Sequence, residues 1–297
     1  MARPSRLTIA KNDIFALFEA SNQKVYSSAQ LAQILNEQRA FWRLTERTTV
    51  GPFIAFLEQQ EKLKAHNFYS EQYNRTVVRY TWGTASLYEL AQSIQPRGYL
   101  SHSTAVALHG LTDLIPKVLY LNVEQSPKPS PRGPLTQRGI DQAFSRKQRQ
   151  SNMTYKLDGH DWSVTVINGK STGALGVEEL TGPSEEKLRA TNLERTLIDI
   201  TVRPTYAGGI FQVLAAYRTA KDRVSTNRLL ATLKKLDYVY PYHQAVGFLM
   251  ERAGYDDKRS AMFQKFGMAH DFYLTHGMVK PEYSSKWRLF YPNGLNG

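Results

Sequence analysis

The sequence predicts an α+β protein with a small N-terminal domain followed by a larger mixed α/β domain. Its length of 297 residues fits two domains better than one. Near residue 83, an order of three short helices and two paired strands changes to mixed helices and strands without regular βαβ alternation. We therefore expect one domain over residues 1–83 and a second over residues 84–297.

The N-terminal domain begins with three short helices. The first is expected at about residues 13–20, where apolar residues recur at helical spacing. The second follows Ser27, because Gln30 three residues later completes a capping-box pattern. The third opens at residues 51–52, Gly-Pro, since proline is favoured at the first helical position. The polar, basic stretch 39–49 is read as a turn between the last two helices.

Two strands complete this domain. Residues 65–69 and 76–82 are rich in aromatic and β-branched residues, and residues 70–75 form the tip between them. Three helices followed by a two-stranded ribbon is the order of a winged helix-turn-helix, whose third helix enters the DNA major groove. The sequence therefore predicts a winged helix-turn-helix.

The candidate DNA contacts of this domain lie at the start of the third helix and on the wing. They are Arg43, Arg47, Thr48, Thr49, Asn74, Arg75 and Arg79. Arginine can bond guanine through two N–H groups, threonine suits phosphate oxygens or thymine methyls, and the wing residues suit the minor groove or the backbone. The alternative is that the same domain docks another protein, with these arginines as ordinary surface charges.

The overall charge favours a polyanionic partner. Lys and Arg total 38 against 26 Asp and Glu, a formal net charge of +12. The absence of Cys excludes disulfides, thiolate zinc sites, Fe–S clusters and cysteine nucleophiles. We find no secretory signal and no apolar run long enough to span a membrane, so we expect a soluble cytoplasmic protein without a membrane partner.

A second basic segment covers residues 125–150, with four prolines and six basic residues against one Asp. Its proline-rich start is expected to be an exposed loop, and residues 138–149 a basic helix or arm. The segment is either a second phosphate contact or a solvated loop that keeps the protein soluble. Its candidate contacts are Lys128, Arg132, Arg138, Arg146, Lys147 and Arg149.

Catalytic patterns in the larger domain are weak. His102 and His109 share a helix face but have no third ligand at a recognisable spacing. Thr191 and Glu194 form a capping-box pattern at the start of a helix, on which Arg195 and Asp199 are spaced as an i,i+4 ion pair. We therefore expect no catalytic residue, no metal and no cofactor.

The alternative to a purely binding protein is a DNA-processing enzyme or an accessory subunit of a bacterial defence system. Asp161 with residues 185–187, Glu-Glu-Lys, could form a nuclease-like cluster that holds Mg²⁺. Cleavage that depends on Mg²⁺ and on Asp161 or Glu186 would distinguish this hypothesis.

The chain as a whole resembles the AbiEi family of antitoxins. The resemblance rests on residues 99–105 (YLSHSTA), 108–112 (LHGLT), 193–199 (LERTLID), 203–204 (RP) and 206–209 (YAGG), together with the N-terminal position of the winged helix. This chain departs from the family in its stretch 39–49 and in its long proline-rich basic loop.

The resemblance implies an antitoxin and transcriptional repressor of a type IV toxin–antitoxin system in bacterial phage defence. Such a protein binds inverted repeats in its own promoter through the winged helix. Its functional partner is a toxin that resembles a nucleotidyltransferase, and it opposes the toxin's effect without an obligatory complex. Double-stranded DNA of its own operator is thus the expected direct partner.

Overall fold

The computed structural model describes residues 4–127 and 133–295. They form two compact units. The first contains the chain up to Pro96 together with Met153–Val164, and the second contains Arg97–Asn152 and the chain from Thr165 onward. The boundary thus falls at Pro96 instead of near residue 83, and a segment from the middle of the chain joins the first unit. The mixture of helices and β-sheet confirms the predicted α+β class.

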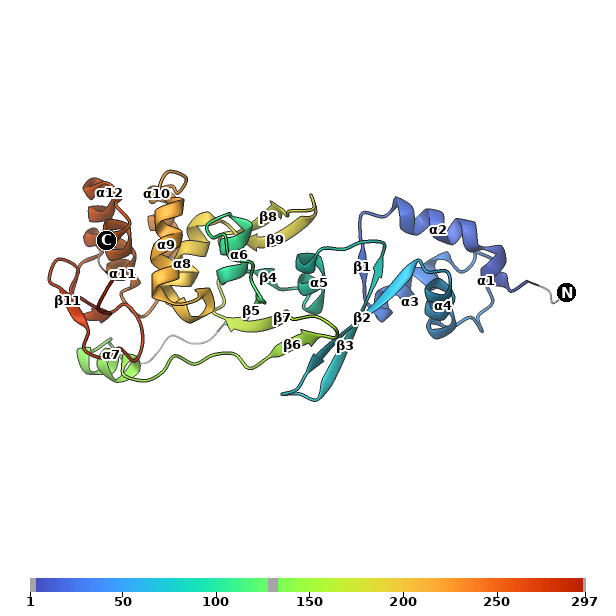
Figure 1. The fold of residues 1–297 in the computed structure, drawn as a ribbon, viewed down its shortest axis with the longest axis horizontal. Coiled ribbons are helices and arrows are strands. Elements are labelled where there is room, and N and C mark those ends of the chain that lie inside the picture. Colours follow the sequence, from blue (N-terminus) through green and yellow to red (C-terminus); the bar gives the residue numbers. More distant parts are fainter. Residues whose placement is uncertain (1–3, 128–132, 296–297) are drawn as a thin grey trace. The chain divides into compact units, whose positions relative to one another are not determined.

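The first unit contains short helices and a small antiparallel sheet (Figure 1). Its helices are α1 (Arg6–Ile9), α2 (Lys11–Ala20), α3 (Ser28–Gln38), α4 (Val50–Gln59) and α5 (Leu87–Ile94). Its strands are β1 (Val25–Tyr26), β2 (Leu63–Ser70), β3 (Arg75–Trp82) and β6 (Thr154–Leu157). The strand order is β1-β3-β2-β6, and each neighbouring pair is antiparallel.

The start of α3 confirms the predicted capping box. The Ser27 hydroxyl accepts a hydrogen bond from the Gln30 backbone N–H at 3.2 Å. The Gln30 side-chain oxygen accepts one from the Ser27 N–H at 2.8 Å. These two bonds satisfy N–H groups that a helix start would otherwise leave without partners.

Aromatic stacking joins the helices of the first unit to its hairpin. Phe18 of α2 stacks on Trp82 of β3, with ring centroids 4.7 Å apart. Trp42, between α3 and α4, stacks on Phe53 of α4 at 5.8 Å. All four side chains are buried. The position of α4 therefore depends on Trp42 as well as on its own apolar face.

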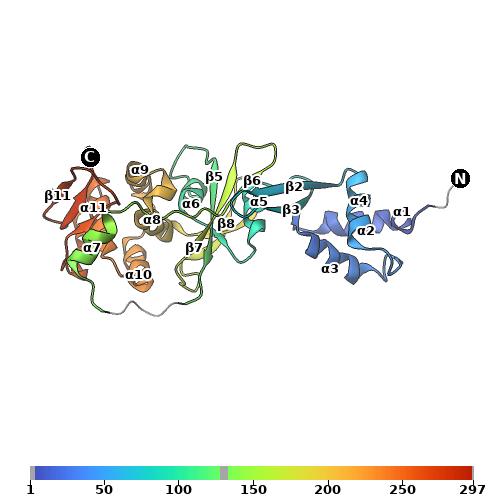
Figure 2. The ribbon, with the colours of Figure 1, turned by 90° about the horizontal axis from the view of Figure 1, so that it is seen from below.

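The second unit contains a five-stranded part of sheet, a group of helices and a separate three-stranded sheet (Figure 2). Its strands are β4 (Tyr99–Leu100), β5 (Val118–Glu124), β7 (Ser163–Gly169), β8 (Val177–Thr181), β9 (Lys187–Thr191), β10 (Phe272–Tyr273), β11 (Glu282–Ser284) and β12 (Leu289–Tyr291). Its helices are α6 (His102–Leu108), α7 (Gln137–Phe144), α8 (Leu193–Val202), α9 (Ile210–Ala220), α10 (Thr226–Leu236), α11 (Tyr242–Arg252) and α12 (Asp257–Ala261), with 3-10 turns η1 (Pro204–Ala207) and η2 (Met262–Phe266). The strand orders are β7-β5-β4-β9-β8 and β10-β12-β11.

The capping box predicted for α8 is wrong. Asn192 caps this helix, and its side chain accepts a hydrogen bond from the Arg195 N–H at 3.0 Å. The Thr191 hydroxyl instead bonds Thr196, and the Glu194 carboxylate accepts from the Ser225 backbone N–H at 2.9 Å. The Glu194 side chain, which the local pattern assigned to the helix cap, therefore bonds the residue that precedes α10 instead.

Helix α11 has a glycine where an indole ring lies against it. A Cβ atom at Gly247 would come within 2.1 Å of the Trp287 ring, so only glycine fits there without a shift. Trp287 is fully buried, and its ring N–H donates to Glu251 at 3.0 Å. The C-terminal sheet is thereby anchored to α11.

Candidate nucleic-acid interface

The connection between α3 and α4 is held in shape by Arg39. Its guanidinium donates hydrogen bonds to the backbone carbonyls of Thr45 and Thr48, the latter at 3.1 Å, and to the Asn36 side chain at 2.9 Å. Trp42 and Leu44 anchor the same segment in the core. The loop ahead of α4 is therefore a defined surface. Sequence reasoning did not single out Arg39, and nothing in its local pattern distinguishes it from a solvated arginine.

The residues predicted to read DNA lie in this connection and not on α4 itself. Arg43, Arg47 and Thr49 are exposed, and Thr48 is half-buried. Arg43 adopts a left-handed backbone with φ of 53°, and its carbonyl accepts a hydrogen bond from Arg6 at 3.0 Å. The third helix was expected to open at residues 51–52 and begins at Val50, so these side chains lie before its first turn, in the stretch that was read as a turn.

The start of α4 is small and open. Thr49 is its N-cap residue, but the Thr49 side chain makes no capping hydrogen bond. Gly51, Pro52 and Ala55 are the exposed residues of the first turns. Such small side chains let a flat or grooved partner approach the helix end, where backbone N–H groups favour anions. The exposed face of α4 carries no cation of its own, so positive charge near this end comes from the preceding connection and from Arg6, which is bonded to it.

The tip of the β2–β3 hairpin brings polar side chains together. Asn74 has a left-handed backbone with φ of 43°, and its side chain accepts a hydrogen bond from the Tyr69 hydroxyl at 3.2 Å. Arg75 begins β3 and is exposed, and Tyr73 beside it is 49% exposed. Strand β6 supports the hairpin, since Phe68 lies opposite Leu157 in the ladder.

Arg79 does not belong to this surface. Its guanidinium donates to the carbonyl oxygen of Ser93 at 2.9 and 2.8 Å and to that of Val78 at 2.8 Å. Burial lowers the pKa of this half-buried side chain. The predicted wing contact is therefore corrected: Arg79 ties β3 to the end of α5, and its donors already have acceptors.

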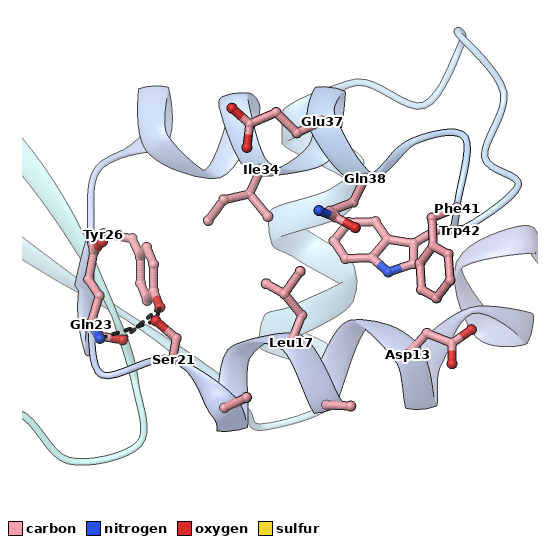
Figure 3. A pocket seen from close by; sticks show the side chains of 12 residues that line it. Asp13, Leu17, Ser21, Gln23, Tyr26, Ile34, Glu37, Gln38, Phe41 and Trp42 are labelled. Atoms are coloured by element: carbon pink, nitrogen blue, oxygen red, sulfur yellow. Dashed lines mark hydrogen bonds between the residues drawn. The ribbon is translucent and has the colours of Figure 1, made fainter.

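An apolar groove lies between α2 and α3, and its lining does not suit a nucleic acid. It has a volume of about 610 Å³, and Figure 3 shows Leu17 and Ile34 facing each other across it with Trp42 at one end. Asp13 and Glu37 also line it. Because carboxylates repel phosphate, we do not include this groove in the nucleic-acid interface.

The second predicted basic group lies in the other unit. Arg138 is exposed on α7, and Arg146, Lys147 and Arg149 are exposed in the irregular segment after it. Residues 138–149 were expected to be a basic helix or arm, and the structure has a helix only as far as Phe144. Lys128 and Arg132 lie outside the residues that the structure describes.

The carboxylates of the nuclease hypothesis have local roles. Glu186 accepts a hydrogen bond from the Ser184 backbone N–H at 2.7 Å, and Glu185 has a left-handed backbone with φ of 63° in the same turn. Asp161 is exposed and belongs to the first unit. Within residues 4–127 and 133–295, no group of three or more His, Cys, Asp or Glu side chains is arranged to hold a metal ion.

Comparisons with known proteins extend the description of the fold. No protein-family model and no curated protein sequence matches this chain. The chain is similar in structure to the RV2827C protein of Mycobacterium tuberculosis, at 15% sequence identity and a TM-score of 0.55. The match covers 95% of this chain and 91% of that one, and at this identity it concerns the fold alone. No helix in the described part of the chain is both long and apolar enough to cross a membrane.

Proposed function

We propose that the first unit is a winged helix-turn-helix that binds double-stranded DNA. The observation that carries the proposal is the order α2, β1, α3, α4, β2, β3, with β1 paired to β3 and β2 paired to β3 in a hairpin. In this arrangement α3 and α4 are the helix-turn-helix pair, and the hairpin is the wing.

The proposed contact surface has two parts. Arg43, Arg47 and Thr49 place two guanidinium groups and a hydroxyl beside the start of α4, where they can meet phosphates and base edges of the major groove. Asn74 and Arg75 at the wing tip suit the minor groove or the adjacent backbone. Arg79 is left out because its donors are occupied by main-chain carbonyls.

The fuller proposal is a cytoplasmic transcriptional repressor and antitoxin of a type IV toxin–antitoxin system. It is supported by the resemblance of residues 99–112 and 193–209 to the AbiEi family and by a DNA-binding module placed at the N-terminus. The protein would bind inverted repeats in its own promoter. It would oppose a nucleotidyltransferase-like toxin without an obligatory complex between the two.

A gel-shift series on the DNA upstream of the gene tests the proposal. Wild-type protein should bind this DNA more tightly than unrelated duplex of equal length. The double substitution Arg47→Ala with Thr49→Ala should weaken specific binding about 10-fold or more, because contacts to bases are each worth about 1–3 kcal/mol. Arg218→Ala serves as the control, since Arg218 is exposed on α9 of the second unit.

Two results would count against the proposal. Equal affinity of the wild type for upstream and unrelated DNA would contradict a role as a sequence-specific repressor. Unchanged affinity of the double variant at physiological salt would remove the start of α4 as the binding surface.

A further inference from the structure

The second unit contains a small polar cavity that DNA binding does not use. It has a volume of about 120 Å³. The residues that line it come from distant parts of the chain and include His102, Asn122, Lys170, Arg195, Asp199 and Arg203. Three of these side chains are cationic and one is a carboxylate, so the lining carries excess positive charge.

Four polar side chains of this lining are more than nine-tenths buried: His102, Asn122, Arg195 and Asp199. Arg195 donates through Nε to Asp199 at 2.7 Å and through another nitrogen to the Leu175 carbonyl at 2.6 Å. One carboxylate is thus matched by one guanidinium. Burying ionised groups is costly unless each one is paired, so the burial of these two groups needs no ligand to explain it.

The Lys170 ammonium group also has hydrogen-bond partners within the protein. It donates to the carbonyl oxygens of Leu236 and Asp237, both at 2.6 Å. These carbonyls belong to the end of α10, where a cation complements the helix dipole.

The side chains of Arg203 and Asn122, in contrast, have no hydrogen-bond partner among the described residues. Among the described residues, the half-buried Arg203 guanidinium makes no hydrogen bond, although its charge acts on the nearby Asp199, and it lies 5.7 Å from the centre of the Tyr206 ring. The Asn122 amide likewise has no hydrogen-bond partner there, although Asn122 is only 4% exposed. Polar groups that are buried in proteins are nearly always hydrogen-bonded to protein, water or a ligand, so the buried Asn122 amide has room for a bound partner in a cavity of this size.

Gly169 keeps the space for the Asn122 amide. A Cβ atom at position 169 would come within 2.4 Å of the Asn122 side-chain oxygen. The imidazole of His102 is neutral, because burial, together with the charges of Arg203 and Arg195, lowers its pKa to about 3. His102 also has a left-handed backbone with φ of 52°. Neutral donors and one uncommitted guanidinium therefore surround a volume that fits a small group.

We propose that this cavity binds a small oxyanion of the phosphate class, with Arg203 and Asn122 as its main donors. Guanidinium and amide N–H groups match the oxygens of phosphate, and Lys170 adds positive potential. Asp199 opposes the anion, but its charge is already paired with Arg195. The phosphate is either the free ion or the terminal group of a mononucleotide.

Thermal melts and calorimetry with inorganic phosphate test the site. At saturating phosphate the wild type should melt about 2–4 °C higher than in chloride of equal ionic strength. Arg203→Gln should weaken phosphate binding about 10- to 100-fold, because it removes a charge-assisted hydrogen bond. Gly169→Ala should also weaken it, since the added methyl group displaces Asn122.

Matched variants separate this site from the DNA surface. Arg218→Gln, on an exposed face of α9, and Arg47→Ala, in the first unit, should both keep wild-type phosphate affinity. A parallel titration with adenosine monophosphate identifies the source: tighter binding than phosphate assigns a nucleotide, and weaker binding assigns the free ion. The proposal is overturned if phosphate stabilises the wild type no more than chloride, or if Arg203→Gln binds phosphate normally.

Discussion

The slope of DNA affinity against salt concentration should report how many arginines of the proposed interface contact phosphate. Arg43, Arg47 and Arg75 are its exposed arginines among the described residues. If each neutralises one phosphate, the logarithm of the association constant falls with the logarithm of salt concentration with a slope of about −2.7, at about −0.9 per contact. Raising the salt from about 50 to 200 mM should then weaken binding about 40-fold.

Single substitutions should change this slope in steps. Arg47→Ala removes one contact, so its slope should be about −1.8, and the same rise in salt should weaken its binding about 12-fold. Thr49→Ala is the uncharged counterpart, because it should lower affinity without changing the slope. Fluorescence anisotropy of a labelled upstream duplex over a salt series measures both quantities.

Two outcomes would refute the reasoning. If Arg47→Ala had the wild-type slope, its guanidinium would not lie on a phosphate. If Arg218→Ala, in the second unit, changed the slope as much as Arg47→Ala did, the effect would reflect total charge instead of a defined surface.

Two further predictions concern the second unit. Gly247→Ala should destabilise the protein by about 1–3 kcal/mol in denaturant unfolding, despite the better helix propensity of alanine, because its methyl group overlaps Trp287; equal stability would show that the ring can move. Burial would raise the pKa of Glu124, but hydrogen bonds from Thr172, Tyr99 and Ala174 hold it below the usual range. The ionised carboxylate therefore adds stability above the unfolded pKa of about 4.3 and loses it as the pH falls through the lower folded value. Glu124→Gln should lower Tm at pH 7 and differ less from the wild type in acid, and a difference independent of pH would contradict this assignment.

Local patterns in the sequence predicted α2, α3 and α4 of the first unit but not the short helix α1. The capping box of Ser27 and Gln30 was confirmed because both partners lie within one helical turn. The same pattern failed at Thr191 and Glu194, where the backbone N–H of Ser225 competes for the carboxylate. A capping motif is reliable only where no distant donor reaches its side chain, and a sequence does not show that donor.

The candidate DNA surface could be predicted only in part for the same reason. Exposure of Arg43 and Arg47 follows from a polar stretch between two apolar helices. The position of the Arg79 side chain depends instead on the carbonyls of Ser93 and Ile94, which lack helical partners at the end of α5 and accept its hydrogen bonds. Helix α5 also packs against β1 and β3, so the first unit includes it and extends to Pro96.

The cavity of the second unit could not be assembled from any local spacing. Its donors Asn122 and Arg203 are far apart in the sequence, and only the pairing of β5 with its neighbours and the end of α8 bring them to one cavity. The sequence pattern identified Arg195 and Asp199 as an ion pair but could not indicate that the pair is buried.

The net charge of +12 therefore overstates the charge available to a nucleic acid. Arg39 and Arg79 donate to main-chain carbonyls, and Arg195 is buried with a carboxylate. Each of these arginines counts fully in the net charge but stabilises the fold instead of facing a partner. Because counterion release depends on contacts with phosphate and not on total charge, affinity for DNA should follow the few exposed arginines of the first unit. A salt slope near −2.7 would fit that surface. A slope several times steeper would require further cations, either other exposed ones of the first unit such as Arg6 and Lys64, or those of the second unit such as Arg138 and Arg146.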